Sequence, residues 1–215
     1  MLRSLMLRWF TLICCFTGGI ARAQEWEVGA IGGFGFAPDL TLQGAAGTAS
    51  AGLQNGGVIG AFIGEDTREH LGGEVRYLYR DSSLKLSSDG TTTDFSGRSH
   101  IIHADLLPYF RGRASRLRPF VAFGGGVTIV QGTGAQSASQ PLGRFAALTN
   151  TNQVLATGDF GAGVKFNASR HLRIRFEIRD YVSSRPNKVI APAPGVRMEG
   201  ILQDILPLGS LSYTW

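Results

Sequence analysis

The residues that could do chemistry begin with a histidine and an aspartate two positions apart, His103 and Asp105. In an extended segment such side chains point the same way, so the carboxylate could orient the imidazole for base chemistry. Neither residue has an evident nucleophile as a sequence neighbour, and the four histidines of the chain show no metal-ligand spacing. We therefore expect no catalytic residue, no metal and no cofactor, and we assign the pair to a polar network.

Other charged residues follow the same two-residue spacing. Between residues 172 and 179 the odd positions are charged and the even positions are apolar. The residues assigned to one polar network are Glu74, Arg76, Arg80, His103, Asp105, Lys165, Arg173, Arg175, Glu177, Arg179 and Asp204. Their mixed signs favour ion pairing, with a gated ion path through Arg175, Glu177 and Arg179 as the alternative.

Alternation of apolar and polar residues also identifies the elements that must position these side chains. It predicts strands over residues 25–36, 53–64, 71–81, 95–110, 117–130, 154–167, 171–181 and 201–215. Helical periodicity is absent from all of these segments. The glycine runs at 124–126 and 161–163 lie inside strands, so we interpret them as sites of close backbone approach and not as phosphate loops.

The connections between these strands alternate in length. The long connections are 37–52, 82–94, 131–153 and 182–200, and the short ones are 65–70, 111–116 and 168–170. This order predicts an all-β protein, an eight-stranded antiparallel up-and-down transmembrane β-barrel. A barrel of this strand number has an interior just wide enough for side chains to fill, so the polar network should plug it.

The first 23 residues are typical of a cleaved signal peptide. Arg3 and Arg8 precede an apolar stretch, and Ala21 and Ala23 supply the small residues of a cleavage site. The stretch is shorter than the roughly 20 residues of a membrane-spanning helix. Residues 24–215 then form one barrel domain. Both cysteines lie in the signal, which excludes a disulfide framework, while a lipid-modified cysteine is a less favoured alternative.

Removal of the signal also changes the charge balance. Three arginines leave with it, so the net charge falls from +5 to +2, with 18 basic against 16 acidic residues. A nucleic-acid partner loses its main support.

Several segments together carry a resemblance to a known family. They are a Pro-aromatic, glycine-rich segment at 118–127, the segments 161–166 and 175–181, and the alternating end Leu211, Tyr213 and Trp215. In order and spacing they resemble the small eight-stranded outer membrane β-barrels of the OmpA/OmpX type and the broader class of bacterial outer membrane β-barrel domain proteins. The chain ends on tryptophan where phenylalanine is commoner.

The resemblance implies an integral protein of the bacterial outer membrane. Leu211, Tyr213 and Trp215 would be the assembly signal read by the barrel assembly machinery. Outer membrane lipids and lipopolysaccharide would be the partners, and we expect a monomer. Tyrosines and tryptophans at strand ends, namely Trp26, Tyr109, Tyr181, Tyr213 and Trp215, should form an interfacial girdle.

The remaining functional capacity lies in the long connections, which we expect to be solvated loops. Arg185, Lys188 and Arg197 in the last of them could contact lipopolysaccharide phosphates or another partner. The resulting hypothesis is a non-enzymatic barrel with a structural or loop-mediated surface role. The alternatives are a small conduit for ions or apolar solutes, a lipid-A-modifying enzyme that uses His103, and a soluble lipocalin-type barrel of inverted polarity.

Overall fold

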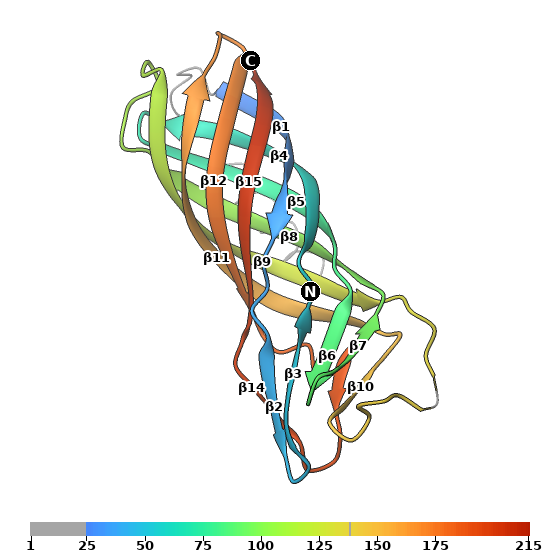
Figure 1. Ribbon diagram of the computed structural model, residues 1–215. Coiled ribbons are helices and arrows are strands. Elements are labelled where there is room, and N and C mark those ends of the chain that lie inside the picture. Colours follow the sequence, from blue (N-terminus) through green and yellow to red (C-terminus); the bar gives the residue numbers. More distant parts are fainter. Residues whose placement is uncertain (1–24, 138) are drawn as a thin grey trace, which may run out of the picture.

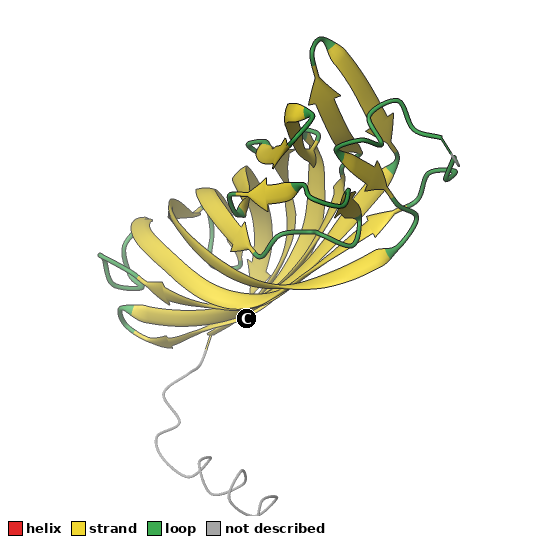
Figure 2. Ribbon diagram, turned by 90° about the horizontal axis from the view of Figure 1, so that it is seen from below, coloured by secondary structure: helices red, strands yellow, loops and turns green. Residues whose placement is uncertain are grey.

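The computed structural model describes residues 25–137 and 139–215 of the chain. The predicted signal peptide, with Ala21, Ala23 and both cysteines, lies outside the described residues. The described chain consists of strands joined by turns and loops (Figure 2). Within it, no helix is long and apolar enough to cross a bilayer.

Eight strands close into one antiparallel barrel (Figure 1). Around the wall they follow the order β1-β15-β12-β11-β9-β8-β5-β4. Their bounds are β1 Glu25–Gly35, β4 Gly56–Arg68, β5 Leu71–Asp81, β8 Gly97–Pro108, β9 Leu117–Gly132, β11 Asn152–Asn167, β12 Leu172–Ser183 and β15 Leu202–Thr214. Each barrel strand pairs with the next one along the chain, which is the predicted up-and-down topology.

The first and last strands close the wall. β1 pairs with β15 from Glu27 opposite Thr214 to Gly33 opposite Leu208. At the chain end the backbone amides of Trp26 and Trp215 donate to each other's carbonyl oxygens at 3.2 and 3.1 Å. Closure leaves no open sheet edge, so the backbone of the barrel pairs internally as a hydrocarbon environment requires.

Alternate residues of each barrel strand face outward and inward. On β12, Phe176 and Ile178 are 67% and 62% exposed, whereas Arg175 and Arg179 are fully buried. Apolar side chains therefore cover the outside and charges fill the inside, as in a barrel that spans a membrane. A lipocalin-type barrel has the opposite polarity and is excluded.

Seven further strands extend the fold beyond one end of the barrel, opposite the chain end at Trp215 (Figure 1). Five form a sheet of order β14-β2-β3-β6-β7 and two form the pair β10-β13. Their bounds are β2 Leu40–Gly44, β3 Gly47–Leu53, β6 Leu84–Ser88, β7 Thr91–Phe95, β10 Ala146–Leu148, β13 Ile190–Pro192 and β14 Arg197–Glu199.

The expectation of four solvated loops is therefore wrong. The long connections pack around their own apolar core, which includes the fully buried side chains of Leu42, Leu86, Phe145 and Ile190. Alternating leucines in β2 and β6 turn one face of each hairpin inward. We call this part of the molecule, formed by residues 37–55, 82–96, 132–151 and 184–201, the extension.

Candidate functional site

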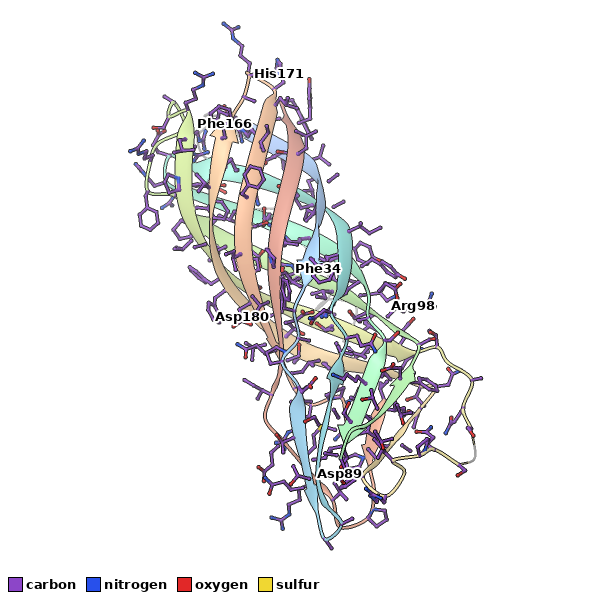
Figure 3. All side chains as sticks on the ribbon, viewed as in Figure 1. Phe34, Asp89, Arg98, Phe166, His171 and Asp180 are labelled. Carbon is purple, nitrogen blue, oxygen red and sulfur yellow. The ribbon has the colours of Figure 1, made fainter. Side chains whose placement is uncertain are left out.

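All eleven charged residues assigned to the polar network lie buried inside the barrel. They project from five strands: β5 carries Glu74, Arg76 and Arg80, β8 carries His103 and Asp105, β11 carries Lys165, β12 carries Arg173, Arg175, Glu177 and Arg179, and β15 carries Asp204. Figure 3 shows the side chains of the barrel projecting to both sides of its wall.

Four further buried charges complete this interior and were missed from sequence. They are Glu27, Asp66, Arg118 and Asp159. Each has the inward parity of its strand, which is the signal that could have found them. Within the described chain the buried charged set thus comprises seven carboxylates and seven arginines or lysines, together with His103. The fixed charges of the interior balance.

One ion-pair cluster lies at the barrel end that carries the chain terminus. Lys165 Nζ is 2.7 Å from Glu27 Oε2 and 2.7 Å from the Tyr109 hydroxyl. Arg118 Nη1 lies 2.5 Å from Asp66 Oδ2. Arg173 joins these groups, with its Nη1 3.3 Å from Glu27 and 3.4 Å from Asp66. The cluster links strands on different sides of the lumen.

A second cluster occupies the middle of the barrel and centres on Arg179. Its Nη2 is 3.1 Å from Glu74, its Nε is 2.9 Å from Glu177, and its Nη1 is 2.8 Å from Asp159 and 3.1 Å from Asp105. Four carboxylates therefore surround one guanidinium. Glu74 also pairs with Arg76 and, at 2.6 Å, with Arg175. Buried ions need such multiple partners to offset their desolvation.

His103 lies against this cluster. Its Nδ1 is 2.8 Å from Asp105 Oδ1 and 3.4 Å from Asp159 Oδ1, and its Nε2 is 3.0 Å from the Tyr181 hydroxyl. Both ring nitrogens thus have partners within the protein, and the side chain of His103 has no solvent exposure. This geometry gives a substrate no access to the imidazole, so the His103–Asp105 pair acts as part of the interior network.

His103, Asp105 and Asp159 also come close enough to be tested as a metal group. Each offers one ligand atom, and these atoms lie within 4.8 Å of one another. Arg179 Nη1, however, already contacts both carboxylates. A divalent cation would repel this guanidinium and add charge to a balanced interior, so the residues do not fit a metal.

Apolar side chains occupy the lumen on the extension side of the charged layers. Ile31, Val58, Leu78, Ile101 and Leu206 belong to one buried cluster inside the wall. Beyond them Arg80 pairs with Asp204 and donates to the carbonyl oxygen of Gln54 at 2.7 Å. The core of the extension follows. Ion pairs, an apolar layer and a second apolar core thus succeed one another along the lumen.

Glycines make room for the buried arginines and carboxylates. A Cβ at Gly161 would lie 2.5 Å from Cδ of Arg179, and one at Gly124 would collide with the carboxylate of Asp105. The glycine runs in β9 and β11 therefore serve close approach, as expected from their position inside strands.

Two of the five predicted girdle residues point inward. Tyr109 and Tyr181 are 5% and 1% exposed, and their hydroxyls bond to Lys165 and His103. Both have the odd parity of the charged faces of β8 and β12, so parity should have placed them inside. Trp26, Tyr213 and Trp215 are exposed on the outer wall.

The extension carries a cleft. It has a volume of about 590 Å³ and lies between the segments 37–39 and 53–55 and the β6–β7 hairpin. Asp39 and Lys85 line it 3.9 Å apart, and Gln54 donates to Asp94 at 2.6 Å. The three cations singled out in the last long connection, Arg185, Lys188 and Arg197, are exposed, and Arg185 donates to the carbonyl oxygen of Met198.

A family model for the outer membrane protein beta-barrel domain matches residues 10–191. This match covers most of the chain and agrees with the closed eight-stranded wall. The chain belongs to the outer membrane protein beta-barrel domain family. It is therefore an integral protein of the bacterial outer membrane. In bacterial outer membrane barrels the short turns lie in the periplasm and the longer connections lie outside the cell.

Solved structures of outer membrane β-barrel proteins share the fold. Neisserial surface protein A is 11% identical with a TM-score of 0.54, and the match covers 88% of this chain and 97% of that protein. Outer membrane protein OprG from Pseudomonas aeruginosa is 10% identical with a TM-score of 0.51, covering 88% and 95%. At this identity the likeness extends to the fold alone. No curated protein matches the sequence at a significant level.

The general orientation of the family assigns one end of this outer membrane β-barrel to the periplasm. Trp26 and Trp215 mark the periplasmic end, where Phe166 and His171 also lie, and Asp89 lies in the extension at the opposite end of the molecule (Figure 3). The exposed ring of Trp215 stacks on Tyr213 with centroids 6.3 Å apart. Amphipathic rings at this level suit a membrane interface.

Proposed function

We propose that this protein is a non-enzymatic surface barrel that anchors and displays its extracellular extension. The observation that carries the proposal is an interior filled by buried side chains. Seven buried carboxylates and seven buried cations fill the barrel, and two apolar clusters follow them along the lumen. A wall this narrow that is filled by side chains is an anchor and leaves no aqueous path.

The extension supplies the part that can meet a partner. Its buried core holds two small sheets in place, so its outer surface is fixed in shape. A preorganised surface loses less conformational entropy on binding than a mobile loop does. Lys188 and Arg197, which have no ion pair among the described residues, add positive charge suited to lipopolysaccharide phosphates.

Planar-bilayer recording distinguishes a barrel that acts only as an anchor from one that conducts ions. We expect no discrete current steps from the refolded barrel under conditions in which a large porin conducts. Reproducible single-channel steps that scale with protein concentration would contradict the proposal. The same preparation must first show the heat-dependent gel shift of a folded barrel, so that failure to insert is not read as closure.

Shortening the extension tests whether the extension is the part of the protein that meets a partner. Residues 40–53, the β2–β3 hairpin, can be replaced by a short turn because the hairpin pairs outside the barrel wall. We expect the variant to keep its heat shift and to lose the thermal stabilisation that added lipopolysaccharide gives the intact protein in nanodiscs. A K188Q/R197Q variant should lose the same effect while the extension stays folded. Equal stabilisation of all three proteins would overturn the display role.

A further inference from the structure

The net positive charge of the protein lies at its periplasmic end. The interior balances at seven against seven. The extracellular side balances as well, with six acidic residues against six basic ones among the described residues: Asp39, Asp81, Asp89, Asp94, Asp180 and Glu199 against Lys85, Arg98, Arg144, Arg185, Lys188 and Arg197. The periplasmic end has five arginines, Arg68, Arg111, Arg113, Arg116 and Arg170, against Glu25, Glu65 and Glu69.

Four of these arginines make no ion pair within the described protein. Arg68, Arg111, Arg116 and Arg170 are exposed. The guanidinium of Arg116 lies 5.4 Å from the ring centre of Phe166. On the extracellular side, Lys85 and Arg144 each have an aspartate within 4 Å, whereas Lys188 and Arg197 have no ion pair among the described residues. The periplasmic rim, defined by these four arginines, therefore leaves its charge to an outside partner.

The rim begins where the apolar wall ends. Phe110 and Leu117, which are 68% and 44% exposed, directly adjoin Arg111 and Arg116 in sequence. The Asn167 side chain donates to the carbonyl oxygen of Ser115 at 2.9 Å, so the β8–β9 connection lies beside the end of β11. Apolar side chains in lipid with guanidinium groups just beyond them place the rim at headgroup level.

We propose that the periplasmic rim binds anionic phospholipids of the inner leaflet of the outer membrane. Guanidinium groups pair well with phosphate oxygens, and an uncompensated positive rim favours a headgroup with a net negative charge over a zwitterionic one. The lipopolysaccharide phosphates lie at the other end of the barrel. Phospholipid phosphates are the anions that share the level of the rim.

Tryptophan quenching can test this directly, because both tryptophans of residues 24–215, Trp26 and Trp215, lie at the periplasmic end. The protein is refolded into phosphatidylcholine vesicles that contain a fixed fraction of brominated phosphatidylglycerol or, in parallel, of brominated phosphatidylcholine. We expect stronger quenching by the brominated phosphatidylglycerol. We also expect the excess to fall as sodium chloride screens the charges.

Substitution assigns the effect to the rim. In R68Q/R111Q/R116Q/R170Q the two brominated lipids should quench equally, whereas the matched variant K85Q/R144Q/K188Q/R197Q should keep the wild-type excess. Equal quenching in the wild-type protein, or an excess that survives in the rim variant, would overturn the proposal.

Two further results would also test whether the rim binds anionic phospholipids. Saturable binding of isolated peptidoglycan that removes the lipid preference would overturn the proposal in favour of a cell-wall contact. If the rim variant fails to show a heat shift, the salt titration of the wild-type protein decides whether the rim binds the anionic lipid. An excess of quenching that came from apolar contacts would not fall as salt is added. The quenching is measured at the periplasmic end and in vesicles without lipopolysaccharide, so the result is independent of the display role.

Discussion

Nζ of Lys165 lies 2.7 Å from Oε2 of Glu27 and joins β11 to β1, which are separated in the barrel wall by β12 and β15. Both side chains are buried. The same ammonium group donates to the Tyr109 hydroxyl. The interior thus fastens strands that share no backbone hydrogen bonds, and its charges contribute to the barrel as a connected set.

Replacing Lys165 by methionine should destabilise the barrel. The change leaves Glu27 buried with Arg173 at 3.3 Å, Arg175 at 3.4 Å and the Ser212 hydroxyl as its remaining partners. We expect the free energy of unfolding to fall by about 3 kcal/mol, the lower end for a broken buried pair. Urea unfolding in phospholipid vesicles, followed by tryptophan fluorescence, measures it. The exposed Lys188→Met is the control and should change stability by at most about 0.5 kcal/mol. A similar small loss in K165M would contradict the prediction.

A charge placed on the outer wall should cost most at mid-membrane. Phe176 is 67% exposed in the middle of β12, and Phe110 is 68% exposed at the periplasmic boundary. We expect Phe176→Arg to lower the free energy of unfolding by about 2–4 kcal/mol and Phe110→Arg by only about 0–1 kcal/mol. The same unfolding assay applies to both. Equal losses would mean that the membrane does not sit where the apolar wall places it.

Removing the imidazole of His103 should change stability and leave lipid A untouched. In His103→Ala, Asp105 and Asp159 keep Arg179 but lose the Nδ1 partner, and the Tyr181 hydroxyl loses Nε2. We expect a loss of about 1–3 kcal/mol from the unsatisfied buried groups. The mass spectrum of lipid A should be identical in cells with the wild-type protein, the variant or neither. A mass change that requires His103 would establish the enzymatic alternative.

A charge in the core of the extension should unfold that part alone. Leu86 is fully buried among the apolar residues of the extension, whereas Thr92 on the neighbouring strand is exposed. We expect Leu86→Asp to open the extension to surface protease while the barrel keeps its heat-dependent gel shift. Thr92→Asp should resist cleavage as the wild-type protein does. Loss of the heat shift in L86D would show that barrel and extension fold as one unit.

The last strand should matter more in cells than in detergent if its end is an assembly signal. Tyr213 stacks on His171 and Trp215, with ring centres 5.4 and 6.3 Å away. We expect Tyr213→Ser to lower the amount of barrel in the outer membrane several-fold and to refold normally in detergent. Leu172, which pairs opposite Tyr213, provides the control Leu172→Ser at the same depth. Equal defects from both changes would point to lost lipid contact instead of lost recognition.

The barrel follows from local patterns in the chain. All eight segments with period-two alternation overlap the eight barrel strands, and the third, residues 71–81, matches the bounds of β5. Alternation settles which side chains share a face, because successive residues of a strand point to opposite sides. The same rule placed the eleven charged residues on one face of their strands, and it would have placed Tyr109 and Tyr181 there too.

Which charged residues pair with one another inside the lumen is decided by the closed wall and not by the local sequence. Nothing near Arg179 in sequence indicates that its guanidinium would meet Glu74, more than 100 residues away, because that contact depends on how the sheet curls and staggers as it closes. The extension is a second case. Strands β2 and β6 each contribute two leucines, spaced two residues apart, within segments rich in glycine, serine and threonine. Each hairpin is therefore too short to form a core by itself. Only when four connections meet at the same end of the barrel do these leucines bury one another and become a structure.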